Sequence, residues 1–261
     1  MELEAQEVTL YRVRDQHGEI RVAERGLIRF LFFDQGTQQS ATLRGHPYAL
    51  ILHYAQAMSM VLLFHPAPKR VLVIGLGGGS LVNFLFTLFP NTQIDVIELR
   101  PDVVDVAHTY FDVPRHHPRI NITIADAHDF LRPHAAGTWD IILSDAFDAD
   151  GPAHGMDSKA HARNVRRALS ANGVACFNLW NRLEDDFPNA AQSISKAFLG
   201  RTIQYTLGSE NSNAMILGFS DAIVDFSDPR YYNRAQKFRQ KTGIDYPDLL
   251  EKMIRMNAPF T

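Results

Sequence analysis

The chain has 261 residues, of which 46% are hydrophobic and 21% charged, values typical of a globular protein with one large domain or one main domain and a small partner. A formal net charge of −3 argues against a nucleic-acid binder that relies on bulk positive charge. No apolar run reaches the ~18 residues of a membrane span, the acidic N-terminus does not resemble a signal peptide, and the single cysteine, Cys176, fits a reducing compartment. We therefore expect a cytoplasmic protein that contacts neither membrane nor nucleic acid.

The first 45 residues predict a small antiparallel cap. Turn residues separate short β-like runs over 8–13, 19–23, 27–33 and 38–43. Residues 46–64 then predict a helix, which Pro66 and Pro68 end. We place the domain boundary here: residues 1–45 form an N-terminal β-hairpin cap and residues 46–261 form the main domain.

From residue 69 onward, apolar strands alternate with helices. Strands fit residues 71–74, 94–98, 121–125, 141–144 and 174–178, and helices fit residues 80–89, 102–110, 129–132 and 158–169. Nearly all-apolar strands that alternate with helices predict a parallel sheet covered on both faces. A helix over 188–199, a strand pair over 202–206 and 214–219, and a helical tail over 228–261 follow. The predicted fold class is α/β, a Rossmann-like sheet of the S-adenosylmethionine methyltransferase type with a small N-terminal antiparallel β cap.

The most informative segment is Val71-Leu-Val-Ile-Gly-Leu-Gly-Gly-Gly-Ser80, which predicts a strand, a glycine turn and a helix. The glycines of such a turn allow positive φ and let a ligand approach bare backbone at the N-terminus of the next helix. The turn supplies four candidate ligand contacts: Gly75, Gly77, Gly78 and Gly79. Glu98 lies about 20 residues further on, where nucleotide-binding α/β folds place the acid that holds ribose hydroxyls.

Polar side chains also follow the later strands, and ligands of open parallel sheets bind at those carboxyl ends. Asp126 follows the third predicted strand, and Asp145 and Asp148 follow the fourth. A single carboxylate at a strand end is usually a helix cap or a turn residue, and Asp126 also fits an N-cap. Carboxylates at three successive strand ends above a glycine turn predict a nucleotide-like site. We expect Glu98 to bind ribose hydroxyls and Asp126 to bind an adenine amino group.

Clustered carboxylates favour a cationic ligand, because like charges are costly without a partner. The pyrophosphate of a dinucleotide would be repelled, whereas a sulfonium nucleoside, S-adenosylmethionine or its decarboxylated form, fits better. Trp180 follows the fifth predicted strand, where it either stacks on a ligand or closes the core. The histidines lack a His-Glu-x-x-His spacing and no second cysteine is present, so we expect no metal site.

The order of these motifs resembles the spermidine synthase (polyamine aminopropyltransferase) family over roughly residues 17–220. The resemblance is carried by the glycine turn, Val96-Ile-Glu-Leu-Arg-Pro-Asp102, Ala125-Asp126 and Trp139-Asp-Ile-Ile-Leu-Ser-Asp145-Ala-Phe-Asp148. The cap is also similar in outline, with Gln39 before a helix that carries Tyr54. The resemblance implies in-line transfer of an aminopropyl group from decarboxylated S-adenosylmethionine, a co-substrate, to a small cationic amine such as putrescine, with no permanently bound cofactor.

The resemblance also implies residue roles. Asp145 would help to remove a proton from the attacking amine, and Asp148 would help to seat that amine. Tyr54 would line the amine pocket, and the donor would contact Gln39, Glu98, Asp126, Ala127 and the glycine turn. We also expect Asn178 and Trp180 to line the amine pocket, because they lie at the end of the fifth predicted strand. An aspartate beside a sulfonium is expected to have a low pKa, so we expect positioning to supply more of the rate than proton transfer.

The sequence departs from the family pattern at Gly78, where the family's turn carries an aspartate that anchors the donor's free amine. The family's Gln-Gly-Glu segment is replaced by Asn178-Leu-Trp180. Two alternatives therefore stay open: an S-adenosylmethionine-dependent methyltransferase, and a nucleoside-binding homologue without normal catalysis. On the aminopropyl interpretation, we expect Gly78→Asp to improve binding of the decarboxylated donor. Family members commonly assemble through the β cap, so a homodimer is one expected state, although the short cap leaves a monomer open.

Overall fold

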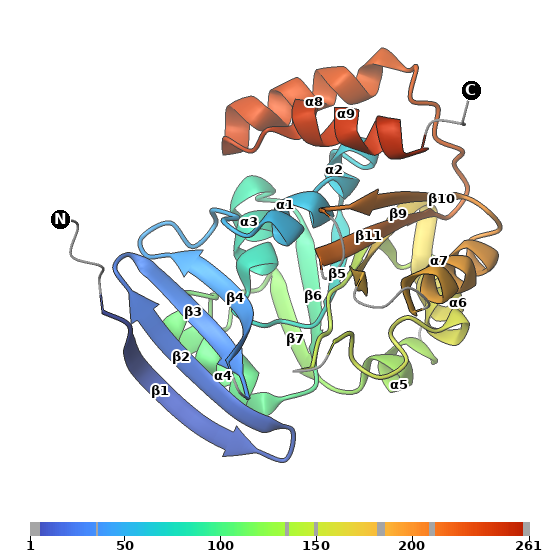
Figure 1. Cartoon of the computed structure of the whole chain (residues 1–261). Coiled ribbons are helices and arrows are strands. Elements are labelled where there is room, and N and C mark those ends of the chain that lie inside the picture. The colour runs from blue at the N-terminus through green and yellow to red at the C-terminus, as the bar shows by residue number, and fades with distance from the viewer. Residues whose placement is uncertain are drawn as a thin grey trace.

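The computed structural model describes residues 6–34, 36–133, 136–148, 151–181, 186–208 and 212–257. Four antiparallel strands form an N-terminal sheet, seen in blue in Figure 1. In spatial order they are β1 (Val8–Asp15), β2 (Gly18–Arg25), β3 (Ile28–Phe33) and β4 (Thr37–Leu43). Alternation along β3 sends Leu31 and Phe33 into the main core, while Phe30 and Phe32 join a small cluster on the opposite face.

The second sheet has seven strands in the order β10-β11-β9-β8-β5-β6-β7. Their bounds are β5 (Arg70–Ile74), β6 (Gln93–Glu98), β7 (Ile120–Ile124), β8 (Trp139–Ser144), β9 (Leu169–Asn181), β10 (Thr202–Thr206) and β11 (Ser212–Phe219). Strands β5 to β9 are parallel, and β11 pairs antiparallel with both β9 and β10. The chain runs from β5 outward through β6 to β7 and then returns to β8 on the other side. The strand order therefore reverses at β5 and β8, where α/β sheets bind ligands.

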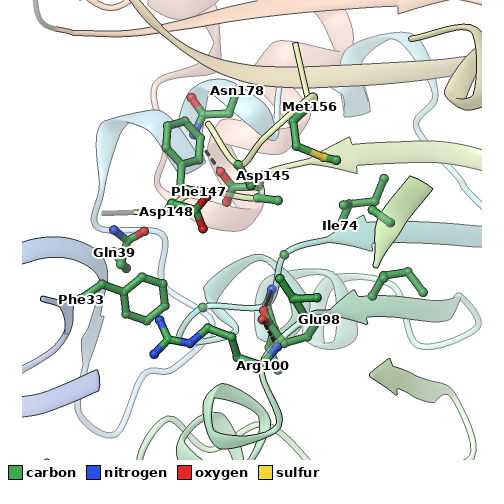
Figure 2. Close-up of a pocket in the computed structure, with 18 of the residues that line it drawn as sticks. Phe33, Gln39, Ile74, Glu98, Arg100, Asp145, Phe147, Asp148, Met156 and Asn178 are labelled. Atoms are coloured by element: carbon green, nitrogen blue, oxygen red, sulfur yellow. Dashed lines mark hydrogen bonds between the residues drawn. The ribbon is translucent and has the colours of Figure 1, made fainter. Parts of the chain in front are cut away.

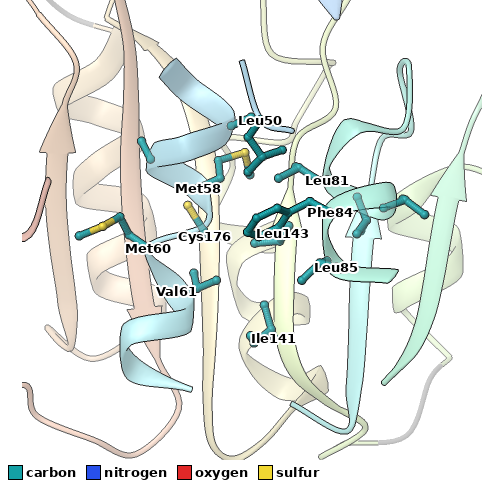
Figure 3. Close-up of a cluster of buried hydrophobic side chains, with 14 of the residues drawn as sticks. Leu50, Met58, Met60, Val61, Leu81, Phe84, Leu85, Ile141, Leu143 and Cys176 are labelled. Atoms are coloured by element: carbon teal, nitrogen blue, oxygen red, sulfur yellow. The ribbon is translucent and has the colours of Figure 1, made fainter. Parts of the chain in front are cut away.

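Helices cover both faces of this sheet, which explains why its central strands β5 and β8 are mostly apolar. Along β5, Val71 and Val73 join one buried cluster and Leu72 and Ile74 join the other. The first cluster includes residues of α1 (His53–Met58), α2 (Val61–Phe64), α3 (Ser80–Leu88), α4 (Pro101–Tyr110), α8 (Pro229–Thr242) and α9 (Tyr246–Asn257). The second includes residues of α5 (Ala127–Leu131), α6 (Lys159–Ala168) and α7 (Asp186–Ala197). Figure 3 shows Met58 and Phe84 of the first cluster between their helices and the sheet.

The alternating pattern predicted this architecture, but the predicted helix over 46–64 is wrong in its first part. Residues 46–52 are not helical, and α1 begins only at His53. Pro47 accounts only for His46, because a proline disfavours helical backbone at the residue before it, and a turn at residues 59–60 also divides the predicted helix into α1 and α2. The helical tail is confirmed for α8 and α9. None of the described helices is both long enough and apolar enough to span a membrane.

A buried ion pair joins the N-terminal sheet to the central one. Arg100, just beyond β6, donates from Nε to Asp15 Oδ2 at 2.9 Å and from Nη2 to Asp15 Oδ1 at 3.0 Å. Nη2 also donates to the Gly18 carbonyl at 3.0 Å, and the guanidinium lies 4.5 Å from the centre of the Phe33 ring. Burial opposes ionisation of Asp15, but the bonds from Arg100 and His17 outweigh it and lower the pKa of Asp15. The pair therefore connects the two sheets. Division of the chain into domains at residue 45 stays a prediction.

We expect Asp15→Ala to lower the free energy of unfolding by ~3 kcal/mol, because it leaves the Arg100 guanidinium buried without its carboxylate. The side chains of Arg100 and Asp15 are only 7% and 15% exposed. Urea unfolding measures the change. Glu251→Ala removes an exposed pair with Arg255 on α9 and should change stability by no more than ~0.5 kcal/mol. Equal effects of the two substitutions would contradict a structural role for the buried pair.

Candidate active site

A cavity of about 430 Å³ lies at the carboxyl ends of β5, β6, β8 and β9, beside the N-terminal sheet (Figure 2). This volume lies within the ~300–1,000 Å³ range of small-molecule sites. Its walls come from the cap, the glycine turn and the strand ends. The predicted site residues that line it are Gln39, Tyr54, Gly75, Gly77, Glu98, Asp126, Ala127, Asp145, Asp148, Asn178 and Trp180. The structure thus brings together, from distant parts of the chain, eleven of the thirteen residues selected from sequence.

The glycine turn is packed against the strand that carries Asp145. Gly75 has φ 87°, and a Cβ at this position would lie 2.4 Å from the carbonyl oxygen of Asp145. The Gly75 N–H donates to Ile97 O at 2.8 Å, and the Asp145 N–H donates to Ile74 O at 2.8 Å. Only glycine satisfies both the positive φ and this close approach.

Gly78 and Gly79, both within the described residues, do not line the cavity. The Gly78 N–H donates to Ser40 Oγ on β4 at 2.8 Å, and Gly79 has φ 72° and packs against Val113. A Cβ on Gly78 would lie 2.9 Å from Ser40 Cβ and 3.0 Å from Phe111 Cδ1. An aspartate at residue 78 therefore requires Ser40 or Phe111 to move. The gain in donor binding expected from Gly78→Asp does not follow from this geometry.

Glu98 is held rigidly at the end of β6. Its Oε2 accepts from Leu76 N of the glycine turn at 2.8 Å, and its Oε1 accepts from Arg100 N at 2.9 Å. The residue is only 8% exposed, and burial raises the pKa of Glu98 while these backbone hydrogen bonds oppose the shift. The carboxylate is fixed before any ligand arrives, with its exposed edge toward the cavity.

Asp126 has two roles in the structure. Its Oδ1 accepts from His128 N at 2.8 Å and from Asp129 N at 3.1 Å, so the helix-cap interpretation is confirmed for α5. The side chain is exposed and still lines the cavity beside Ala127. Capping fixes the side chain, which suits it to present an oxygen to a ligand as well.

Asp145 follows β8 and faces the same cavity. Asn178 Nδ2 on β9 donates to its Oδ1 at 2.7 Å. Burial raises the pKa of Asp145 to about 7, and the hydrogen bond from Asn178 opposes that shift. The sequence predicted a low pKa for this aspartate beside a bound sulfonium. Without a ligand the shift has the opposite sign, because no cation among the described residues pairs with this carboxylate to offset its burial.

Tyr54 of α1 approaches Asp145 from the cap side of the cavity. Its hydroxyl donates to the Gln39 carbonyl at 3.2 Å. Burial, with the charge of Asp145 adding to it, holds the pKa of Tyr54 well above its usual range. The phenol therefore stays protonated, so Tyr54 lines the cavity as an uncharged side chain that can form hydrogen bonds.

Asp148 and Trp180 lie near each other at the mouth of the cavity. The Asp148 N–H donates to Gly151 O at 2.8 Å, which folds the segment after β8 back on itself. The Trp180 ring lies 5.8 Å from the Phe147 ring, and a Cβ on Gly151 would lie 3.4 Å from Trp180 Cε3. Trp180 thus both lines the cavity and packs against the segment that carries the exposed Asp148 carboxylate. Residues 149 and 150 lie outside the described residues.

Several cavity residues were not selected from sequence. Phe33 and Ser40 come from cap strands, and Met156 and Asn213 come from outside the motifs. Alternation could place Ser40 on one face of a strand but could not show that this face meets the glycine turn. Within the described residues, no group of three or more His, Cys, Asp or Glu is arranged to hold a metal ion.

We expect Gly75→Ala to destabilise the protein by ~2 kcal/mol more than Gly45→Ala. Both glycines have similar positive φ, 87° and 82°, but a Cβ at Gly45 meets nothing within 4 Å. The comparison therefore isolates the contact with Asp145, an overpacking effect of ~1–3 kcal/mol. Urea unfolding of the two variants measures it. Equal destabilisation would show that the turn is not tightly packed on Asp145.

Comparisons with known proteins agree with this geometry. The model of the spermine/spermidine synthase domain family matches residues 53–211. A polyamine aminopropyltransferase of Neisseria meningitidis serogroup A is 28% identical over 240 residues, covering 92% of this chain and 90% of that protein. A probable spermidine synthase from Corynebacterium glutamicum has a TM-score of 0.74 at 15% identity, covering 97% and 96% of the two chains. A spermidine synthase in complex with the transition state analogue AdoDATO has a TM-score of 0.76 at 19% identity, covering 96% and 85%. The predicted resemblance and fold are confirmed.

Proposed function

Because the chain belongs to the spermine/spermidine synthase domain family, we propose that it transfers an aminopropyl group from decarboxylated S-adenosylmethionine to a small amine such as putrescine. The polyamine aminopropyltransferases among its relatives support this activity. The observation that carries the proposal is the position of Asp145, a carboxylate set beside Asp148 in the same cavity as Glu98 and Asp126. One end of that cavity suits a nucleoside and the other suits an ammonium group.

At the nucleoside end, Glu98 accepts hydrogen bonds from the ribose hydroxyls and Asp126 accepts one from the adenine amino group. Both carboxylates are held by backbone N–H groups, so little side-chain entropy is lost when the donor binds. Gly75, Gly77, Gln39 and Ala127 line the rest of the donor's path. The donor is a co-substrate, and its sulfonium lies toward the acidic end of the cavity.

At the reacting end, the amine nitrogen attacks the carbon attached to the sulfonium. A C–N bond forms as the C–S bond breaks, and sulfur keeps the electron pair, which leaves 5′-methylthioadenosine. The amine must lose a proton, and Asp145 accepts it. A base with a pKa of about 7 suits this step near neutral pH, while a bound sulfonium lowers that pKa and is itself stabilised by the carboxylate.

The amine is held by Asp148 and by the walls that Tyr54, Asn178 and Trp180 provide. The exposed carboxylate of Asp148 attracts the ammonium, and the neutral phenol of Tyr54 accepts or donates a hydrogen bond without adding charge. Assembly as a homodimer stays a prediction.

A second candidate is methyl transfer from S-adenosylmethionine, and the observation that favours it is Gly78. The family's turn carries an aspartate there, which binds the amine of the donor, and this chain lacks it. Ser40 packs against Gly78 and leaves no room for a side chain at that position. Calorimetric titration with S-adenosylmethionine, its decarboxylated form and 5′-methylthioadenosine separates the two. Tighter binding of the decarboxylated donor, with spermidine detected by mass spectrometry after putrescine is added, supports aminopropyl transfer. Preference for S-adenosylmethionine, with methylated amine as product, supports the second candidate instead.

We expect Asp145→Asn to lower kcat by ~10²–10⁴-fold while donor affinity changes little, because the amide cannot accept the proton. Steady-state kinetics and calorimetry measure the two quantities. The matched control is Asp105→Asn, which changes an exposed aspartate on α4 outside the cavity and should leave both unchanged. Full turnover by the Asp145 variant would remove this residue from the proposed mechanism.

The proposed base also fixes the sign of the pH dependence. Asp145 must be ionised to accept a proton, so kcat/KM for the amine at saturating donor should rise with pH and level off, with a midpoint below the value of about 7 for the free carboxyl because the bound sulfonium lowers the pKa. The measurement is a pH profile of kcat/KM from pH 5 to 9. The acidic limb should disappear from the residual activity of Asp145→Asn. A limb that persists unchanged in that variant would assign it to the amine substrate instead.

A further inference from the structure

We propose that Asn213 is a positioning residue for Asp145 and that it acts through the side-chain amide of Asn178. Asn213 Nδ2 donates to Asn178 Oδ1 at 3.0 Å, and Asn178 Nδ2 donates to Asp145 Oδ1 at 2.7 Å. The three side chains form one directed chain of hydrogen bonds that ends on the proposed base. Figure 2 shows its last link, with the Asn178 amide turned toward Asp145. The role of Asp145 as base rests on the proposed function.

The register of the sheet creates this chain. β11 runs antiparallel to β9, with Asn213 opposite Trp180 and Met215 opposite Asn178. Asn213 is two residues from Met215, so it lies on the same face as Asn178 and diagonal to it. Asn178 itself lies in the buried part of β9, one residue beyond Phe177, which pairs with Ser144 at the end of β8 that delivers Asp145. Three neighbouring strands therefore contribute one polar side chain each.

The amide of Asn178 has two orientations with opposite electrostatic effects. In one, the NH₂ group faces Asp145 and stabilises the carboxylate; in the other, the carbonyl oxygen faces it and repels it. Asn178 is only 5% exposed, so bulk water does little to select between them. In the observed arrangement Asn213 donates its NH₂ group to the carbonyl oxygen of Asn178, and this bond favours the orientation in which that oxygen points away from Asp145.

Among the described residues, three ionisable groups lie near Asp145, and Asp148 is the exposed one, a carboxylate at the same cavity. Tyr54 on α1 and Cys176 on β9 both interact with its charge, and the pKa values of both are raised, so both stay neutral at ordinary pH. Asn178 supplies the hydrogen bond to the carboxylate in the described part of the chain. Loss of the orienting bond from Asn213 should therefore favour protonated Asp145.

The test is a carboxyl ¹³C NMR titration of Asp145 in the full-length protein without substrate. We expect Asn213→Ala and the near-isosteric Asn213→Leu to raise the titration midpoint by ~0.5–1 pH unit, because each removes the donor that orients Asn178. Asn213→Asp should raise it further, because its carboxylate attracts the Asn178 NH₂ group and adds negative charge. Asn178→Ala is the positive control, and Asn233→Ala, an exposed asparagine on α8, is the matched negative control.

The acidic limb of the pH profile of kcat/KM should move with the midpoint, which a merely structural defect would not cause. Thermal unfolding checks that each variant is folded, and the alanine and leucine variants stand in for each other if one is not. A wild-type midpoint in the Asn213 variants, together with a raised midpoint in Asn178→Ala, would overturn the proposal. The titration needs no turnover, so failure of aminopropyl transfer in the wild-type protein would count against the proposed function and leave this result intact.

Discussion

The candidate site depends on the close packing of the glycine turn after β5 against the backbone that leaves β8. Gly75 takes a positive φ and leaves no room for a side chain beside the Asp145 carbonyl. That contact lets the turn present bare backbone on one side of the cavity while Asp145 turns its side chain into the same space. Glu98 then bonds to the Leu76 N–H of the turn, so three adjacent strand ends share one fixed geometry. The distances between carboxylates follow from backbone packing and not from side-chain flexibility.

The charge of the cavity depends on which of its ionisable side chains form ion pairs. Asp15 neutralises Arg100, the one arginine that lines the cavity in the described chain. Four carboxyl groups, those of Glu98, Asp126, Asp145 and Asp148, line the same cavity. Burial makes this costly for Asp145 in particular, and the cost is relieved when a cation enters. The cavity therefore favours a positively charged ligand even before any specific contact is considered.

Much of the fold could be predicted from sequence because β5, β6 and β8 are apolar on both faces, a pattern that few arrangements other than a covered parallel sheet produce. The carboxylates could be predicted too, since Glu98, Asp126 and Asp145 each lie at or within two residues of the carboxyl end of a strand. The helix over residues 46–64 was predicted too long, and nothing in the local sequence marks the turn at residues 59–60 that separates α1 from α2.

What could not be predicted depends on contacts between distant segments. Ser40 approaches Gly78 only because the cap docks in one orientation, and Asn213 approaches Asn178 only through the register of β11 on β9. The raised pKa of Asp145 likewise reflects enclosure by segments that lie far apart in sequence. A local sequence pattern carries no information about distances between segments that lie far apart in the chain.

The ion pair between Arg100 and Asp15 links the docking of the cap to the geometry of the ligand site. Arg100 is two residues from Glu98 and gives its backbone N–H to the Glu98 carboxylate, while its side chain holds the cap. Separation of the cap would uncover an unpaired guanidinium beside the nucleoside end of the site and would also release Ser40 from Gly78. The cap and the ligand site therefore form one cooperative unit. A ligand that binds the acidic cavity binds only the form in which the cap is docked, so its binding free energy stabilises the association of the two sheets.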